Sequence, residues 1–312
     1  MEGKYSLGIG LNLFDARAVL LREDNKVITE VKKNRTNINA NETIKVLLQL
    51  FEEIVSKAKK YKNNIEGVGL ALGGIVNSRK GIVYWPERAG SYISLPLRDY
   101  LEKKFGFPVF IENDASACAW AEHVINFPKC KNLIYMFSGV GCGIIADGKL
   151  YKGRDGGAGE IFLNFQKIMS SRLGDFSFLK QWPADLDIIK RAKELISLGK
   201  ESSLVKKISS TGELPLENIF KEAQKKDKVA KEAIKEAAFS LGVKIAFLVN
   251  LLNPDAVVIG GGLENAGEFI LEECVGAVKK FAFMEMKKNC KISLSQLGTD
   301  ATSQGAAMLV FK

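Results

Sequence analysis

The stretch that most constrains the fold runs from residue 109 to residue 163, where strand-like and helix-like segments alternate with glycine-rich turns. Val109 to Glu112 has the composition of a buried strand, Asn113-Asp114 follow as a turn, and small residues from Ala115 to Glu122 predict a helix. Such alternation is typical of an α/β sheet. Because open sheets of this kind hold ligands where their strands end, the Asn113-Asp114 turn is a candidate site.

Two glycine-rich turns continue this stretch. A second predicted strand, Leu133 to Phe137, precedes the segment Ser138 to Gly143, a hairpin turn is expected at Asp147-Gly148, and Gly156 to Glu160 closes the segment. Backbone N–H groups of glycine-rich turns bind phosphate oxygens, and a carboxylate accepts the proton of an attacking hydroxyl. The order of these turns and carboxylates is therefore compatible with phosphoryl transfer.

Length and charge narrow the class of protein. With 312 residues, the chain is long enough for two domains that each have a core. The net charge of +9 suggests nucleic-acid binding, but between residues 221 and 236 the lysines alternate with acidic residues, as on a solvated helix face. We therefore expect no DNA binding, although a basic surface attracts anionic substrates such as nucleotides.

Cysteine spacing and hydropathy favour a cytoplasmic protein. The odd number of cysteines and their apolar neighbours predict reduced, buried thiols. The single histidine, His123, is expected at the surface or at a helix end rather than as a ligand. No signal peptide or membrane span is visible, because Gly, Lys or Asn interrupts the longest apolar runs. The cysteines are Cys118, Cys130, Cys142, Cys274 and Cys290.

The remaining segments complete an α/β pattern without repeats or low-complexity regions. In the first part of the chain we predict strands at 5–13, 15–22, 27–32 and 67–72, a helix at 42–60 capped by Asn39 or Asn41, a loop at 85–94 and a helix ending at 104. In the last part we predict helices at 186–198, 215–226, 228–252 and 302–311, one more starting near residue 265, and strands at 256–259 and 291–295.

Four segments carry a resemblance to a known family. Phe107 to Ala115 matches the motif LPVFVENDA, and Asn250 to Gly262 matches NLLNPEVIVIGGG. The other two segments are 147–161, with its Gly-Ala-Gly-Glu, and Gly305-Ala306-Ala307. The chain thus resembles the ROK family of repressors and sugar kinases. This resemblance implies a two-domain, actin-like ATPase (ribonuclease H-like) α/β fold with a cleft between the domains.

The resemblance also implies domains, site residues and cofactors. The small α/β domain would span residues 1–113 with the closing helix 300–312, and the large α/β domain residues 114–299. Asp114 would be the catalytic base. The family's cofactors are ATP and Mg²⁺, and no zinc is expected because the CxCGxxGCxE segment is absent. The family's sugar contacts correspond to Gly74, Asn113, Asp114 and Glu160, and its nucleotide contacts to Ser138, Gly139, Gly141, Gly260, Gly261 and Gly262.

Each of these residues also has a purely structural interpretation. Asp114 is a common type of N-cap for the helix that follows it. Asn113 has the chemistry of a turn residue, and Glu160 that of a solvated side chain. The turn at 138–141 fits a tight β-turn, and the three glycines at 260–262 fit close packing between a strand and a helix.

The sequence departs from the family at the first phosphate loop. Where the family has GIDIGGTKIRAVL, the metal-side aspartate is Gly10, and GGTK has become Asn12-Leu13-Phe14-Asp15. A bulky phenylalanine and a carboxylate prevent the close approach of phosphate oxygens to backbone N–H groups. On the sugar side, the family's histidine, loop asparagine and proline are replaced by Leu163, Arg88 and Gly73.

Three functional hypotheses follow. The first is an ATP-dependent kinase for a hexose or N-acetylhexosamine, of the glucokinase type, with Asp114 as the base. The second is a non-catalytic sugar-binding or regulatory descendant, because losing several charge-stabilising groups leaves little catalysis. The third and least supported is a repressor, since the first strand begins within the first few residues. The resemblance also implies a homo-oligomer, while the sugar is not identified.

Overall fold

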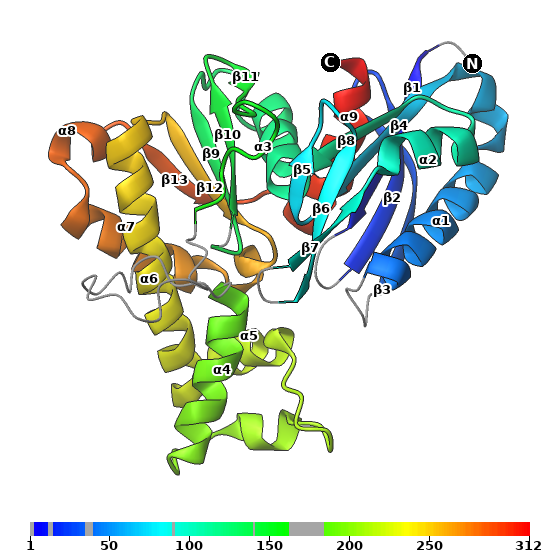
Figure 1. Ribbon diagram of the computed structural model, residues 1–312. Coiled ribbons are helices and arrows are strands. Elements are labelled where there is room, and N and C mark those ends of the chain that lie inside the picture. Colours follow the sequence, from blue (N-terminus) through cyan, green and yellow to red (C-terminus); the bar gives the residue numbers. More distant parts are fainter. Residues whose placement is uncertain (1–2, 12–14, 35–39, 89–90, 140, 162–183) are drawn as a thin grey trace. The chain divides into compact units, whose positions relative to one another are not determined.

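The computed structural model describes residues 3–11, 15–34, 40–88, 91–139, 141–161 and 184–312, and these residues form a mixed α/β fold, as predicted (Figure 1). The chain divides into two compact units. The first consists of residues 1–135, 142–160 and 296–312, and the second of residues 136–141 and 161–295. These bounds differ from those of the two predicted domains, which stay a prediction.

The first unit is built on a five-stranded sheet with the order β3-β2-β1-β4-β8. The first three strands pair antiparallel, whereas β4 and β8 run parallel to β1. The carboxyl ends of β4 and β8 are therefore neighbours, with Leu72 beside Asn113. The strands are β1 (Tyr5–Leu11), β2 (Asp15–Arg22), β3 (Val27–Asn34), β4 (Ile65–Leu72) and β8 (Val109–Asn113).

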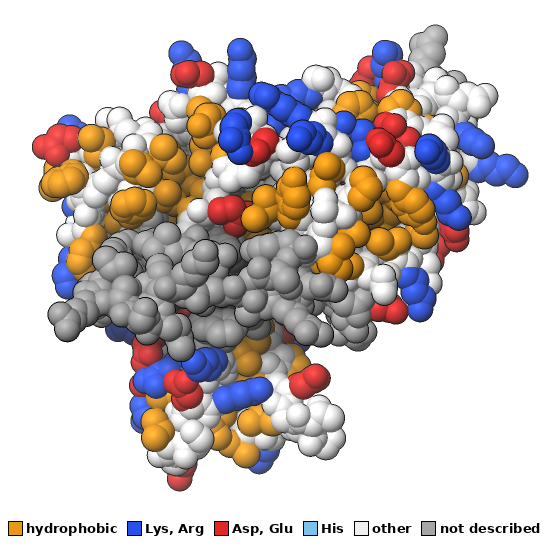
Figure 2. Space-filling view, viewed as in Figure 1, with side chains coloured by type: hydrophobic (Ala, Val, Ile, Leu, Met, Phe, Trp, Pro, Cys, Tyr) orange, Lys and Arg blue, Asp and Glu red, His pale blue; other side chains and the backbone are white. Residues whose placement is uncertain are grey.

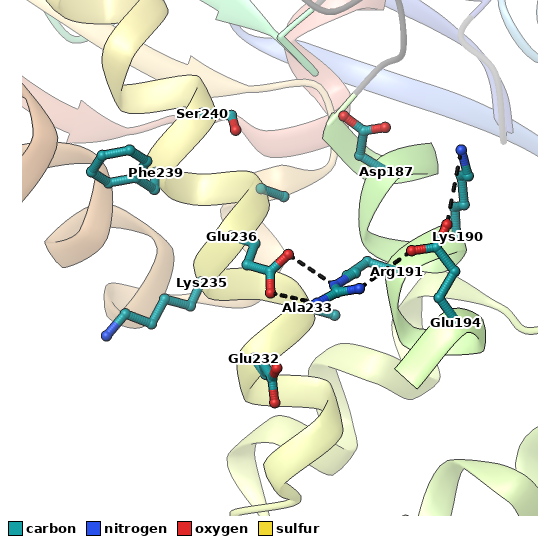
Figure 3. Close-up of a pocket in the computed structure, with 11 residues that line it drawn as sticks. Asp187, Lys190, Arg191, Glu194, Glu232, Ala233, Lys235, Glu236, Phe239 and Ser240 are labelled. Carbon is teal, nitrogen blue, oxygen red and sulfur yellow. Dashed lines mark hydrogen bonds and ion pairs between the residues drawn. The ribbon is translucent and has the colours of Figure 1, made fainter. Parts of the chain in front are cut away.

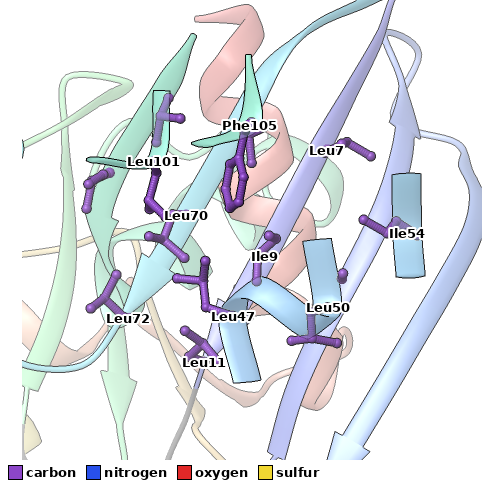
Figure 4. Close-up of a cluster of buried hydrophobic side chains, with 14 of the residues drawn as sticks. Leu7, Ile9, Leu11, Leu47, Leu50, Ile54, Leu70, Leu72, Leu101 and Phe105 are labelled. Atoms are coloured by element: carbon purple, nitrogen blue, oxygen red, sulfur yellow. The ribbon is translucent and has the colours of Figure 1, made fainter. Parts of the chain in front are cut away.

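One face of this sheet holds the main core. Successive side chains of a strand point to opposite faces, so the apolar residues of β1 lie on one side and its glycines on the other. Leu7, Ile9 and Leu11 point toward helix α1 (Ala40–Lys57), which contributes Leu47 and Leu50 (Figure 4). The predicted helix at 42–60 thus ends three residues earlier, and a 3-10 turn follows at Lys59–Asn64. Of the two predicted caps, Asn39 lies outside the described residues, and Asn41 lies inside the helix.

The other face of the sheet is covered by helix α9 (Ala301–Met308) at very short range. Gly8 and Gly10 on β1 and Gly69 on β4 face this helix. A Cβ on Gly69 would lie 1.8 Å from the carbonyl oxygen of Ala306, and one on Gly8 would lie 2.1 Å from a carbonyl oxygen of the same helix. Glycine at these positions therefore allows the helix backbone to rest on the strands.

The predicted loop at 85–94 is wrong, because this segment forms strands. In a small antiparallel sheet with the order β5-β6-β7, the middle strand runs through Trp85, which is buried. Pro86 stands in this middle strand, and a register shift between Pro86 and Arg88 accommodates the missing N–H donor. Because proline is rare in middle strands, the sequence of this segment does not resemble that of a strand. The strands are β5 (Ile75–Asn77), β6 (Ile82–Arg88) and β7 (Ser91–Leu95).

The first unit also contains helices α2 (Leu97–Phe105) and α3 (Asp114–Ile125) and the hairpin of β10 (Gly141–Ala146) and β11 (Lys149–Leu150). The hairpin turns at Asp147-Gly148, as predicted, and both residues have positive φ angles of 50° and 72°. Strand β9 (Leu133–Phe137) leads the chain from the first unit into the second.

The second unit is mainly helical. Helix α6 begins after Asp227, whose side chain accepts the N–H of Ala230 at 2.9 Å, and ends at Asn253 with φ +46°. Helices α4 and α7 pack against α6, and β12 pairs parallel with β13. The elements are α4 (Ala184–Ser197), α5 (Leu216–Gln224), α6 (Lys228–Leu252), β12 (Ala256–Gly260), α7 (Glu268–Phe281), α8 (Met284–Lys287) and β13 (Lys291–Leu294).

The structure tests two smaller predictions. His123 lies in the last turn of α3, so it takes the helix end of its two predicted places, and it is buried, which lowers its pKa. Cys118, Cys142 and Cys274 are buried thiols, whereas Cys130 and Cys290 are only half-buried. Among the described residues, no helix is both long enough and apolar enough to cross a bilayer.

Candidate functional site

The sugar-side residues predicted from the sequence gather in the first unit, at the carboxyl ends of β4 and β8. The Asn113 side chain holds the turn after β8 to the turn after β4, because its Nδ2 donates to the carbonyl oxygen of Gly74 at 3.2 Å. Its Oδ1 accepts the N–H of Ser116 at 3.2 Å. Asn113 is therefore the N-cap of α3, the role that the sequence offered as an alternative for Asp114.

Asp114 is the first residue of α3 and is almost completely buried. Its Oδ1 accepts the N–H of Ala115 at 2.8 Å. Burial raises the pKa of Asp114 to about 6, although backbone hydrogen bonds act in the opposite direction. A carboxyl group that titrates near neutral pH is suited to accept a proton from a hydroxyl group.

Glu160 lies at the end of the loop that follows the β10–β11 hairpin, and its carboxyl group interacts electrostatically with that of Asp114. Glu160 is exposed, in agreement with its alternative interpretation as a solvated side chain, although the nearby protein raises the pKa of Glu160 to about 7, first by desolvation and then by the negative charge of Asp114. The fold thus brings together three residues far apart in sequence, Gly74, Asp114 and Glu160. Their contacts with a sugar stay a prediction.

At Gly10, the structure shows why a metal-binding carboxylate would not fit. A Cβ on this residue would lie 2.7 Å from the backbone nitrogen of Ser303 and 2.9 Å from Cβ of Thr302. Both atoms belong to α9, so the space that a side chain would need is filled by helix backbone. Residues 12–14 of the first phosphate loop lie outside the described residues, as does Leu163.

The nucleotide-side glycines lie in the second unit, where two of the turns are joined to each other. The N–H of Ser138 donates to the carbonyl oxygen of Gly260 at 3.2 Å, and its Oγ donates to that of Gly261 at 2.6 Å. A Cβ on Gly261 would lie 2.9 Å from the nitrogen of Ser138. The Ser138 hydroxyl and N–H are therefore engaged within the chain, and Gly141 simply begins β10.

Two charged residues that sequence reasoning missed contact these turns. Nζ of Lys244, a buried residue of α6, donates to the carbonyl oxygen of Gly139 at 2.8 Å. The carboxylate of Glu264 accepts the N–H of Gly262 at 2.8 Å, so an acidic group already occupies the backbone donor of a residue that the resemblance placed among the nucleotide contacts. Lys244 was detectable, because it is the single charged residue in the run from 237 to 252.

Taken together, these contacts do not fit a magnesium–triphosphate complex. The metal-side carboxylate is missing and has no room, and Glu264 would repel phosphate oxygens. Among the described residues, no group of three or more His, Cys, Asp or Glu side chains is arranged to hold a metal ion.

The second unit also has a polar groove of about 690 Å³ between α4 and α6 (Figure 3). Arg191 on α4 bridges its walls, with Nε 2.8 Å from the carboxylate of Glu236 on α6 and a second contact to Glu194. None of the predicted site residues lines this groove.

Comparison with known proteins decides the family. The ROK family profile matches residues 6–312. The chain belongs to the ROK family. The xylose repressor of Caldicellulosiruptor bescii is 30% identical over 311 residues, which cover 97% of this chain and 77% of the repressor. The glucokinase of Halalkalibacterium halodurans is 27% identical, with 99% and 96% of the two chains covered.

A solved structure shows that this ROK protein has the family's sugar-kinase fold. It superimposes on a ROK family glucokinase from Streptomyces griseus, in complex with glucose and AMPPNP, with a TM-score of 0.80. The identity is 23%, and 98% of each chain is covered. Relatives therefore include both sugar kinases and sugar-responsive repressors, and the predicted fold class and family are confirmed.

Proposed function

We propose that this ROK protein binds a small sugar at the Asp114 and Glu160 carboxyls and does not turn over ATP at a rate typical of a sugar kinase. The crowding of Gly10 by α9 carries this proposal, because it excludes a metal-side carboxylate at that position. The Glu264 carboxylate on the Gly262 N–H supports it independently. Losing one donor that stabilises transition-state charge costs about 3 kcal/mol, and several losses together leave little catalysis.

The sugar class follows from the chemistry of the retained site. Two carboxyl groups and backbone carbonyls accept hydrogen bonds from hydroxyl groups, so a neutral polyol suits the site better than an acid. The names of the relatives suggest D-xylose and D-glucose as first probes, and N-acetyl-D-glucosamine represents the N-acetylhexosamines. Isothermal titration of these three sugars, with and without Mg-AMPPNP, tests the proposal. A sugar signal without a nucleotide signal is expected.

A kinase is the second candidate, favoured by the pKa of about 6 at the buried Asp114. Its substrate would be a hexose or an N-acetylhexosamine, and its cofactors ATP and Mg²⁺. Sugar-dependent ADP release that disappears in D114N would establish this alternative and refute the first. A cytoplasmic location without DNA binding or membrane contact stays a prediction of the sequence analysis.

We also propose that the chain forms a homo-oligomer through an apolar surface of the second unit. Figure 2 shows hydrophobic side chains gathered in the region of α7 and α8. Asn250 holds this region in place, because Nδ2 donates to the Phe281 carbonyl at 3.3 Å and Oδ1 accepts the Phe283 N–H at 2.9 Å. The exposed residues are Phe239, Phe247, Leu251, Leu252, Phe281, Phe283 and Met284.

The size of this surface favours a second copy of the chain as the occupant. At about 200 Å² for each large apolar side chain, the exposed fractions correspond to roughly 700 Å². That exceeds the largest patch of about 300–600 Å² on a typical monomer and approaches the roughly 800 Å² that each partner buries in a stable complex. F283D should lower the mass measured by light scattering after gel filtration, and a wild-type monomer would refute the proposal.

A further inference from the structure

An ion pair between a buried carboxylate and a partly exposed lysine lies directly beside the sugar-side residues of the first unit. Glu112 precedes Asn113 at the end of β8, and its side chain is only 1% exposed. Its Oε2 lies 2.5 Å from Nζ of Lys152, and its Oε1 accepts the N–H of Asn113 at 3.1 Å. A buried carboxylate is strongly destabilising without a cation, so loss of the contact with Lys152 would destabilise the folded protein.

Lys152 begins the loop that ends at Glu160, and this loop is compact. The carbonyl oxygen of Lys152 accepts the N–H of Gly156 at 3.0 Å, and the Cys142 N–H donates to the carbonyl oxygen of Gly159 at 2.8 Å. At Gly156, with φ +110°, a Cβ would lie 2.3 Å from the carbonyl oxygen of Val76, so the loop rests on strand β5. The loop is therefore connected by its backbone both to Lys152 and to strand β5.

We propose that Lys152 is a positioning residue for the sugar site, which it serves by fastening the Glu160 loop to the strand that ends at Asp114. The inference rests on the proposed sugar-binding function. The backbone of Lys152 organises the loop and its ammonium contacts β8, so one residue joins the two segments that carry the two carboxyls. Nζ also lies 3.5 Å from Oγ of Ser78, just beyond β5, which adds a second anchor.

Lys312 offers a matched control, because it is a second cation near the same carboxylate. Burial lowers the pKa of Lys312, the charge of Lys152 lowers it further, and Glu112 acts in the opposite direction. Its Nζ lies 4.1 Å from the centre of the Trp120 ring. Lys312 therefore contributes positive charge near Glu112 without belonging to the 152–160 loop, so the two lysines separate charge neutralisation from loop positioning.

The experiment compares K152M, K152R and K312M in the full chain. Titration with D-xylose, D-glucose and N-acetyl-D-glucosamine measures affinity, and hydrogen exchange of peptides covering residues 151–160 measures the hold on the loop. K152M should weaken sugar affinity about tenfold, since small displacements of binding groups are costly, and speed exchange in this segment by a similar factor. K152R should restore both quantities, and K312M should change neither.

The double variant E112Q/K152M keeps the test valid if K152M alone fails to fold, because removing both charges leaves no unpaired buried ion. It should show the same loss of affinity and the same faster exchange. Unchanged sugar affinity in a folded K152M or E112Q/K152M protein would overturn the inference, as would an equal loss in K312M. If the wild type binds none of the three sugars, the proposed function is refuted, and exchange across residues 151–160 alone decides the role of Lys152.

Discussion

The substitution G10D tests whether position 10 can be restored to a metal-binding aspartate. The new Cβ would lie 2.7 Å from the Ser303 nitrogen and 2.9 Å from Cβ of Thr302. Real Cβ atoms do not approach other atoms at 2.7 Å, so α9 or β1 must move. Trimming Thr302 would not help, because the closer atom belongs to the helix backbone.

Two costs add up in this variant. Overpacking a well-filled interior costs about 1–3 kcal/mol. Burying a polar group without a partner adds roughly 1–3 kcal/mol on the scale of protein mutants. A loss of about 4 kcal/mol is a large part of the 5–15 kcal/mol that typically stabilises a domain. At about 2–4 °C per kcal/mol, the melting temperature should fall by roughly 10 °C.

Differential scanning fluorimetry, with and without Mg-ATP, measures both stability and ligand binding. The matched control is G276D, the same change in helix α7, where a Cβ would meet nothing within 4 Å. This control should change the free energy of unfolding by less than about 1 kcal/mol. A G10D protein that melts like the wild type and is stabilised by Mg-ATP would refute the packing argument and with it the main support for a non-catalytic protein.

Two further predictions follow from charged groups. Because burial raises the pKa of Asp114 from 3.8 to about 6, the folded state binds the proton more tightly than the unfolded state. Stability should therefore fall as pH rises from about 4 to about 6, by roughly 3 kcal/mol from this group. D114N should remove that part of the slope in melting curves between pH 4 and 8, and an unchanged slope would argue against the burial of this charge. The change E264S should free the Gly262 N–H and give an AMPPNP signal in calorimetry that the wild type lacks, since a hydrogen bond to a charged group contributes about 1.5–3 kcal/mol. An E264S protein without an AMPPNP signal would show that Glu264 does not block the turn.

Local signals in the sequence were sufficient for most of the fold. The hairpin at Asp147-Gly148 needs only two residues that tolerate positive φ, and α6 ends where Asn253-Pro254 stop any helix. The strand predicted at 109–112 and the helix predicted at 115–122 follow from composition, and they lie within the observed β8 and α3. A segment with a clear turn or helix-end signal can be identified from its sequence. Strand β6 cannot, because its pairing with β5 and β7 stabilises a strand that contains Pro86.

For the site, the sequence by itself determined which residue types are present, including Asp114, Glu160 and the loss of aspartate at position 10. Only the tertiary structure decided what surrounds them. The sequence shows that position 10 is glycine, but the α9 backbone that packs against it comes from a segment almost 300 residues away. In the sequence, nothing distinguishes Glu264 and Lys152 from other charged residues. Their roles arise from contacts with Gly262 and Glu112. Burial and close approach depend on residues distant along the chain, and no local pattern encodes them.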